Sequence, residues 1–411
     1  MTPEIDVKAG TETVTPTPLS RSSGPIVWLL ALVPLLLLGA LLVWIVRAGP
    51  AESVRGEGYP PVERLTFQRV MLHPDGIEVR LLNDGPDPVA IAQVQVDDAF
   101  WTFTSDRTSP LRHLERATLR IPYPWVQGEA HHLKVLSSTG TAFEHQIPVA
   151  VATPTVTPRF IGTFALIGLY VGVIPVAIGL LWYPLLRRLS ARGMDFVLAL
   201  TIGLLMFLLL DGAFEGLEAA GTLPASFQGM LLFVVAAAGA YLGLEMLGSR
   251  MSRRRSEAAA GGVLALMIAV GIGLHNLAEG LAIGAAFSLG EAALGTLLII
   301  GFTLHNTTEG LAIVAPLIRR GQAPSLGTLI RLGLIGGVPT IAGAWIGGFA
   351  YSPLWAVVFL GLGVGAIAQV VGQIWNQLGR QRQVPALASG PVLSGLAAGF
   401  AVMYVTGMLV G

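Results

Sequence analysis

The chain has 411 residues, of which 53% are hydrophobic and only 12% are charged, whereas an ordinary soluble protein has roughly 25% charged residues. Several apolar runs reach the ~20 residues that cross a bilayer as a helix, so the composition indicates a polytopic membrane protein. The chain contains no cysteine, which excludes disulfides, thiolate zinc sites and thiol catalysis. Its formal net charge of +0 favours no class of partner.

The N-terminal region combines a polar tail with the first apolar span. Residues 1–24 are rich in Thr, Ser and Pro, and we interpret them as a disordered cytoplasmic tail. Residues 25–46 are apolar over a longer stretch than the apolar core of a signal peptide, and no A-x-A cleavage site follows them. We therefore predict an uncleaved transmembrane anchor over residues 25–47.

Residues 51–157 have the pattern of a β domain. Six or seven short alternating or β-branched runs, such as LTFQRVML (65–72) and GIEVRLL (76–82), are separated by turn-like segments such as NDGPDP (83–88). Short strands at this spacing predict an extracytoplasmic immunoglobulin-like β-sandwich. The Pro- and Thr-containing segment ATPTVTP (152–158) then serves as a stiff linker.

Most histidines of the chain fall in this β region: His73, His113, His131, His132 and His145. Adjacent residues of a strand point to opposite faces, so His131 and His132 cannot readily chelate one ion from a regular strand. We interpret these histidines as solvated surface side chains. Because its strands offer edges for pairing, we expect the domain to mediate homodimer contacts or to bind an extracytoplasmic protein partner.

Residues 158–411 predict an eight-helix membrane domain. The predicted spans cover residues 160–184, 194–218, 227–247, 261–287, 291–317, 327–349, 353–377 and 388–410. The loops between them are alternately basic, as at 187–192, 249–255, 319–322 and 380–383, and free of Lys and Arg. The positive-inside rule then puts the basic loops in the cytoplasm and the β domain and C-terminus outside the cell (inner) membrane.

Two neighbouring spans share a motif. Residues 271–287 (GIGLHNLAEGLAIGAAF) and 301–317 (GFTLHNTTEGLAIVAPL) are identical at ten of seventeen positions. Because consecutive spanning helices run antiparallel, this short repeat predicts an inverted pair. In many transporters the substrate site lies at the interface of such repeats, near the bilayer midplane.

The repeated motif offers metal ligands. His275 and Glu279 are four residues apart and share one helix face, as do His305 and Glu309. Facing helices would bring two imidazoles and two carboxylates together, a set that suits Zn²⁺ or another first-row divalent cation.

Other residues of the motif support this interpretation. Asn276 and Asn306 could add amide oxygens, and Gly280 and Gly310 would let the backbones approach closely. The alternative is a set of interhelical hydrogen bonds without an ion. Intramembrane carboxylates are costly and functional by default, which favours the metal site.

Further polar side chains lie in other spans. Asp211 and Glu215 repeat the four-residue spacing, and Glu218 lies near the outer end of the same span. Gln369 and Gln373 are candidates for interhelical hydrogen bonds or for ligation. We expect Glu245 to pair with an arginine of the basic 249–255 loop.

With these motifs, residues ~160–411 resemble the ZIP (Zrt/Irt-like) family of divalent-metal transporters, in its prokaryotic branch. HNLAEG (275–280) and HNTTEG (305–310) are similar to the paired H-N-x-P-E-G signatures of that family, and DGAFE (211–215) is similar to a ligand pattern in its second core helix. The resemblance implies a binuclear site between the fourth and fifth core helices. Its ligands would be His275, Asn276, Glu279, His305, Asn306 and Glu309, with Asp211 contributing and Glu215 as a further candidate.

The chain also departs from the family pattern. Ala278 and Thr308 stand where each signature has Pro, residues 336–348 contain no acid, and Gln373 stands where many members have an acid. Fewer carboxylates favour one high-occupancy ion over two.

The function that we expect is transport of a divalent metal ion into the cytoplasm by alternating access, with Zn²⁺ favoured over Fe²⁺ or Mn²⁺. The metal would be the transported substrate, and no enzyme activity or nucleic-acid partner is expected. A metal-sensing receptor whose β domain binds a partner is the alternative, although the cytoplasmic segments are short for an output domain. An intramembrane metalloenzyme is disfavoured because the sequence contains no H-E-x-x-H motif.

Overall fold

A computed structural model describes residues 25–48, 60–107, 110–252, 260–318, 324–379 and 389–408. The tail predicted over residues 1–24 lies outside them. Helix α1 (Pro25–Ala48) covers the predicted anchor, and its described side chains, from Leu32 to Trp44, are exposed. This helix falls in one compact unit, Met1–Pro61, and the rest of the chain in a second, Val62–Gly411.

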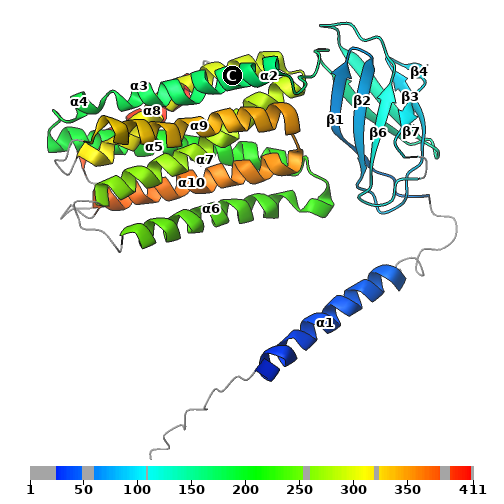
Figure 1. Cartoon of the computed structure of the whole chain (residues 1–411), viewed down its shortest axis with the longest axis horizontal. Coiled ribbons are helices and arrows are strands. Elements are labelled where there is room, and N and C mark those ends of the chain that lie inside the picture. Colours follow the sequence, from blue (N-terminus) through cyan, green and yellow to red (C-terminus); the bar gives the residue numbers. More distant parts are fainter. Residues whose placement is uncertain are drawn as a thin grey trace, which may run out of the picture. The chain divides into compact units, whose positions relative to one another are not determined.

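Two antiparallel four-stranded sheets form the β region (Figure 1). The described strands are β1 (Leu65–His73), β2 (Gly76–Asn83), β3 (Ile91–Val96), β4 (Ala99–Trp101), β5 (Thr104–Ser105), β6 (Arg116–Ile121), β7 (His131–Ser137) and β8 (Ala142–Ile147). One sheet has the order β1-β2-β6-β5 and the other β4-β3-β7-β8. Another of the short runs that suggest single strands, FWTFTS (100–105), divides between β4 and β5, which belong to different sheets. The immunoglobulin-like classification stays a prediction.

The β3–β4 hairpin has a two-residue turn. Val96 pairs with Ala99, and between them Asp97 and Asp98 have positive φ values of 52° and 61°. Positive φ at both central residues is typical of a type I′ turn, in which Asp is one of the few tolerated side chains. The turn therefore follows from the local sequence, and it brings the carboxylate of Asp97 beside β7.

His131, interpreted from the sequence as a solvated surface residue, is buried instead, with 5% of its surface exposed. Its Nδ1 lies 2.8 Å from Oδ2 of Asp97, which also accepts a 2.8 Å hydrogen bond from the Tyr123 hydroxyl. Burial opposes ionisation of Asp97, but hydrogen bonds from the His132 amide, His131 and Tyr123 outweigh it and lower its pKa. Burial, followed by the bond to Asp97, raises the pKa of Tyr123 to about 12.

Seven helical spans in the described residues are long and apolar enough to cross a membrane, as expected for a multi-pass membrane protein. The first, Pro158–Leu186, is interrupted: α2 (Pro158–Gly168), a π-helical turn η1 (Leu169–Val173), α3 (Ile174–Leu180) and α4 (Tyr183–Leu186) follow one another. Thr157 caps α2, because its hydroxyl accepts from the Phe160 amide.

The remaining helices are continuous. They are α5 (Ala191–Gly221), α6 (Gly229–Ser252), preceded by a short 3₁₀ turn η2 (Ala225–Phe227), α7 (Ala260–Ser288), α8 (Ala292–Ile318), α9 (Leu326–Ala350), α10 (Pro353–Gly379) and α11 (Gly390–Met408). The predicted eighth span coincides with α11, in which the described apolar stretch is shorter, Gly390–Val405. The count of eight membrane spans therefore stays a prediction.

Glycines bring α7 and α9 into backbone contact. A Cβ added to Gly280 of α7 would collide with the Thr340 carbonyl oxygen of α9, and a Cβ added to Gly343 of α9 would collide with the Leu277 carbonyl oxygen of α7. Small residues at such positions allow helices to pack closely inside a bilayer. This contact fixes α7, which carries the first copy of the repeated motif.

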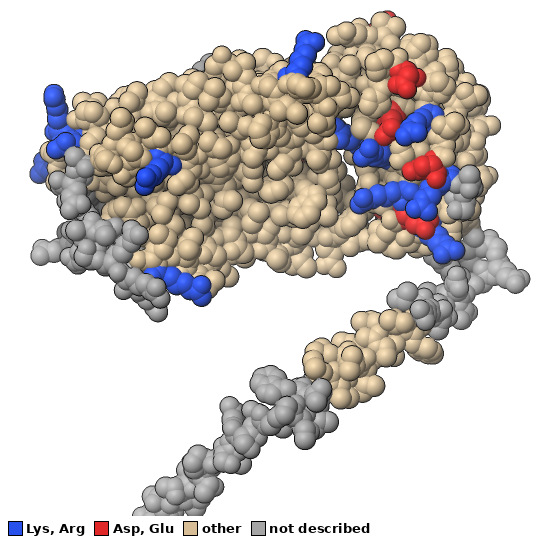
Figure 2. Space-filling model, in the orientation of Figure 1, with Lys and Arg blue, Asp and Glu red and all other residues tan. Residues whose placement is uncertain are grey.

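Charges are sparse on the helical part. Figure 2 shows a largely uncharged surface along the helices, with Lys and Arg at the end where α4 lies and acidic residues in view only on the β region. Much of the basic loops at 249–255, 319–322 and 380–383 lies outside the described residues. The inside–outside orientation therefore stays a prediction.

Candidate metal centre

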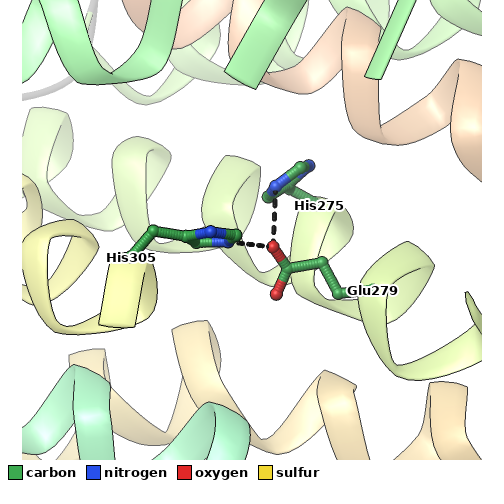
Figure 3. A group of neighbouring side chains, drawn as sticks. All are labelled: His275, Glu279 and His305. Carbon is green, nitrogen blue, oxygen red and sulfur yellow. Dashed lines mark hydrogen bonds and ion pairs between the residues drawn. The ribbon is translucent and has the colours of Figure 1, made fainter. Parts of the chain in front are cut away.

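The two copies of the motif meet where α7 and α8 pack together. His275 and Glu279 of α7 and His305 of α8 each offer one ligand atom, and these three atoms lie within 4.8 Å of one another. Figure 3 shows the three side chains pointing toward a common point between the helices. All three are buried, with 9%, 4% and 6% of their surfaces exposed. The predicted convergence of the two motifs is found for these three residues.

Glu279 is the shared partner of this cluster. Its Oε1 lies against His305 Nε2 in a very short contact and 3.1 Å from His275 Nε2. The His275 nitrogen makes no hydrogen bond despite this short distance. Oε2 of Glu279 accepts a 3.0 Å hydrogen bond from Asn306 Nδ2. Two imidazole nitrogens thus converge on one carboxylate oxygen.

The two asparagines bind backbone carbonyls of neighbouring helices, which the sequence interpretation did not foresee. Asn306 Nδ2 donates to the Val171 carbonyl oxygen of η1 at 3.0 Å. In a regular helix that carbonyl would accept from residue 175, which is Pro175 and has no N–H. Asn306 therefore satisfies a buried carbonyl that the proline leaves free. The proline was the sequence signal for this contact.

Asn276 makes the corresponding contact in the other half of the repeat. Its Nδ2 donates to the Gly336 carbonyl oxygen of α9 at 3.0 Å, three residues before Pro339. Pro339 removes the helical donor of the neighbouring Ile335 carbonyl, because a proline lacks the N–H that would bond four residues back. In both asparagines the amide nitrogen is occupied, and the buried Oδ1 has no hydrogen-bond partner.

Glu309 has a different position from the one predicted. It does not belong to the group of three converging ligands identified among the described residues. Its side chain is buried, with 2% of the residue exposed, and neither carboxylate oxygen has a hydrogen-bond partner. A carboxylate without donors in a low-dielectric interior is strongly unfavourable when ionised. Glu309 therefore marks a place where a cation would be stabilising.

Asp211 and Glu215 border the cluster from α5. Together with His275, Glu279 and His305 they line a cavity of about 30 Å³. Asp211 and Glu215 are both exposed, whereas the three residues of the cluster are buried. A cavity of this size has room for one or two water-sized species. The two acids therefore lie beside the cluster, on the wall of the same cavity.

The two motif glycines contact helices other than the ones predicted. Gly280 lies against Thr340 of α9, whereas Gly310 lies against Val176 and Gly179 of α3. Each glycine therefore fits its own motif helix against a third helix, and the two do not bring α7 and α8 together.

The amides of α10 behave as interhelical hydrogen-bonding groups. Gln369 Nε2 donates to Oε2 of Glu245 at 3.0 Å, and the pairing of Glu245 with an arginine of the basic loop stays a prediction. Part of the basic loop, residues 253–259, lies outside the described residues. The Oε1 atoms of Gln369 and Gln373 are buried without hydrogen-bond partners.

The groups in and around the cluster are of the kind that can bind a cation. Two imidazole nitrogens, two buried carboxylates and two free amide oxygens are all electron-pair donors, and the chain has no cysteine to compete with them. No known protein-family model matches the chain, and a search of curated proteins finds no match either. Function must therefore be inferred from the residues of this site.

Proposed function

We propose that the chain is a ZIP-like transporter that moves a divalent metal ion, Zn²⁺ before Fe²⁺ or Mn²⁺, into the cytoplasm by alternating access. The observation that carries this proposal is the convergence of His275, Glu279 and His305 between α7 and α8, together with the buried Glu309 carboxylate of α8, whose oxygens make no hydrogen bond. Such a carboxylate is stable in its ionised form only with a compensating cation.

The ligand types favour a first-row divalent metal over Ca²⁺ or Mg²⁺. The latter ions prefer oxygen ligands, whereas imidazole nitrogens suit Zn²⁺ and its neighbours. His275 and His305 supply nitrogen and Glu279 supplies oxygen, and these are the usual components of a four-coordinate zinc site. One ion fits this converging group, with Glu309 and the asparagine oxygens available to a second.

The surroundings of the cluster also support the proposal that an ion passes through it. Its cavity is bordered by the exposed acids Asp211 and Glu215, which would attract cations at one end of the path. The many small residues between α7 and α9 present smooth helix surfaces that can slide past each other. In alternating-access transporters the substrate is expected to bind at the interface of two inverted repeats, as an ion at this cluster would.

Uptake of metal into reconstituted vesicles tests the proposal. The full chain is inserted into liposomes that enclose a zinc-sensitive dye, and uptake is compared for the wild type, Glu279→Gln and Glu309→Gln. Each substitution keeps the side-chain shape and removes one charge, so we expect at least about a tenfold loss of apparent zinc affinity while the fold persists.

The matched control is Glu218→Gln, the same chemical change at an exposed position of α5. It should transport like the wild type. Uptake that is equal in all four proteins would overturn the site assignment, and a wild type that binds zinc tightly without moving it would favour the receptor alternative.

A further inference from the structure

A buried arginine connects the β region to the helices within the compact unit Val62–Gly411. Arg69 of β1 has 8% of its surface exposed, and its Nη1 donates to the Phe349 carbonyl oxygen of α9 at 3.4 Å. Its Nε is buried without a partner. Glu78 on the neighbouring strand pairs with Arg80 and Arg120, so it does not neutralise Arg69.

The end of a helix explains why a guanidinium can be buried there. Phe349 lies in the last turn of α9 (Leu326–Ala350), where carbonyl oxygens have no partner within the helix and carry the negative end of its dipole. Burial lowers the pKa of Arg69, with Arg80 adding to the effect and Glu78 opposing it, yet a guanidinium remains charged under all ordinary conditions. The C-terminus of α9 therefore supplies the compensating charge for Arg69.

The β region also reaches the turn between the two motif helices. Arg69 and His145 line a cavity of about 170 Å³ together with residues 289–291, which join α7 to α8. Gly290 in this turn has a φ of +85°, and the Val149 carbonyl oxygen lies 3.3 Å from the place of its missing Cβ. The turn that joins the two metal-binding helices is thus in contact with the chain that follows β8.

Helix α9 carries this contact to the metal centre. Its Gly336 carbonyl binds Asn276, and its Gly343 packs on the backbone of α7. Pro339 lies between the two and has no N–H, so α9 lacks one helical hydrogen bond at the level of Asn276. A displacement of α9 at Phe349 therefore acts on the segment between Pro339 and Phe349. This segment packs on the backbone of α7, and it ends at the missing helical hydrogen bond of Pro339.

We propose that Arg69 is a positioning residue that ties the β region to the C-terminal end of α9 and restrains the α7–α9 pair, so that the β region slows the conformational step of metal transport. This inference rests on the proposed transport function. If the tie exists only in the described conformation, breaking it shifts the population toward the other conformation by the free energy of the tie. The ligands of the metal centre stay in place, so affinity for metal is unaffected.

The test uses Arg69→Met in the full chain, because Met retains an apolar chain of similar length and removes the donor. We expect the maximal rate of zinc uptake into vesicles to rise about three- to tenfold, which is the net effect of one typical hydrogen bond. The half-saturating zinc concentration should stay within about twofold. Arg69→Lys keeps both the charge and a donor and should remain close to the wild type.

Arg80→Gln is the matched control, since Arg80 pairs directly across from Arg69 in the β1–β2 register and is exposed. It should leave both kinetic constants unchanged. A Met variant with the wild-type rate or a lower one would overturn the proposal, and so would a Lys variant as fast as the Met variant.

A second measurement does not depend on transport. The chain contains no cysteine, so nitroxide labels can be attached to Ser138→Cys of the β region and Ser226→Cys of the helical part, both exposed positions. We expect Arg69→Met to broaden the distribution of distances between the labels and Arg80→Gln to leave it unchanged. Equal distributions would refute the tie. A wild type that fails to transport would refute only the proposed function, and the label distances would still decide whether Arg69 restrains the β region.

Discussion

At the scale of single residues, burial of polar groups distinguishes the functional site from the structural contacts. Asn306 is buried completely, yet its amide nitrogen has both Glu279 and the Val171 carbonyl as acceptors. Glu309 is buried to nearly the same extent, and neither of its carboxylate oxygens makes a hydrogen bond. The first arrangement is stable as it stands, whereas the second needs a proton or a cation.

The contact between Asp97 and His131 makes a testable contribution to stability. The lowered pKa of Asp97 means that its stabilising effect is present above its ordinary value of 3.8 and is lost as the pH falls through the lower folded value. Asp97→Asn keeps a residue that tolerates positive φ. Because the side chain is 40% exposed, we expect a loss of about 1 kcal/mol at neutral pH and less below about pH 4.

Hydrogen exchange of the β7 amides in the full-length protein, measured by mass spectrometry at about pH 7 and about pH 3, checks this expectation. Asp98→Asn is the matched control, because Asp98 occupies the same turn with positive φ but is 84% exposed and lies 3.9 Å from Lys134. Equal protection of β7 in the two variants at neutral pH would contradict the assigned role of Asp97.

Local sequence predicted the part of the site that depends on spacing. His275 and Glu279 are one helical turn apart, and His305 lies in the matching position of a repeat, so their convergence followed from the helix period. The Asn306 contact could not be found in this way, because Val171 is 135 residues away. The burial of His131 could not be predicted for the same reason, since its partner Asp97 lies 34 residues earlier, in the β3–β4 turn.

At the scale of elements, the packing of α7 on α9 depends on the absence of side chains. A Cβ at Gly343 would lie 2.8 Å from the Leu281 amide nitrogen as well as against the Leu277 carbonyl. Both atoms belong to the backbone and cannot rotate away. Gly343→Ala should therefore lower the stability of the helical part by about 1–3 kcal/mol, although alanine itself favours a helix by about 1 kcal/mol.

The control for this substitution is Gly239→Ala on α6, where no atom lies within 4 Å of the added Cβ. It should leave the melting temperature of the detergent-solubilised protein unchanged or slightly raised, while Gly343→Ala lowers it. If the two variants melt together, the α7–α9 contact is looser than the structure indicates.

Elements were predictable where one span is one regular helix. Runs of apolar residues gave α5 to α10 nearly to their ends, because a helix in a bilayer must satisfy its own backbone groups. The first span is less regular, since Pro175 interrupts its hydrogen bonding and a π turn results. The division of FWTFTS between two sheets depends on pairing with β3 and β6, which adjacent residues do not encode.

At the scale of the whole molecule, the predicted topology follows from the distribution of basic loops. The natural absence of cysteine makes this testable by single substitutions. We expect Ser226→Cys and Ser138→Cys to react with a membrane-impermeant maleimide on intact cells, because both lie on the predicted outer side. Arg188→Cys, in the basic loop at 187–192, should react only after the membrane is opened. The reverse pattern would invert the orientation, and with it the direction of transport that we propose.

The π turn in the first span has a consequence for the phase of that helix. One residue more than a regular turn rotates the segment before it by roughly 100° relative to the segment after it. Gly168, before the turn, faces Ile341 of α9, and Gly179, after it, faces Gly310 of α8. In a regular α-helix without the π turn, one of the two glycines would be rotated away from its neighbour. Deleting one residue from 169–173 would restore the regular helix, move one glycine face off its partner and withdraw the Val171 carbonyl from Asn306, so this span can contact both α9 and α8 only because it changes phase midway.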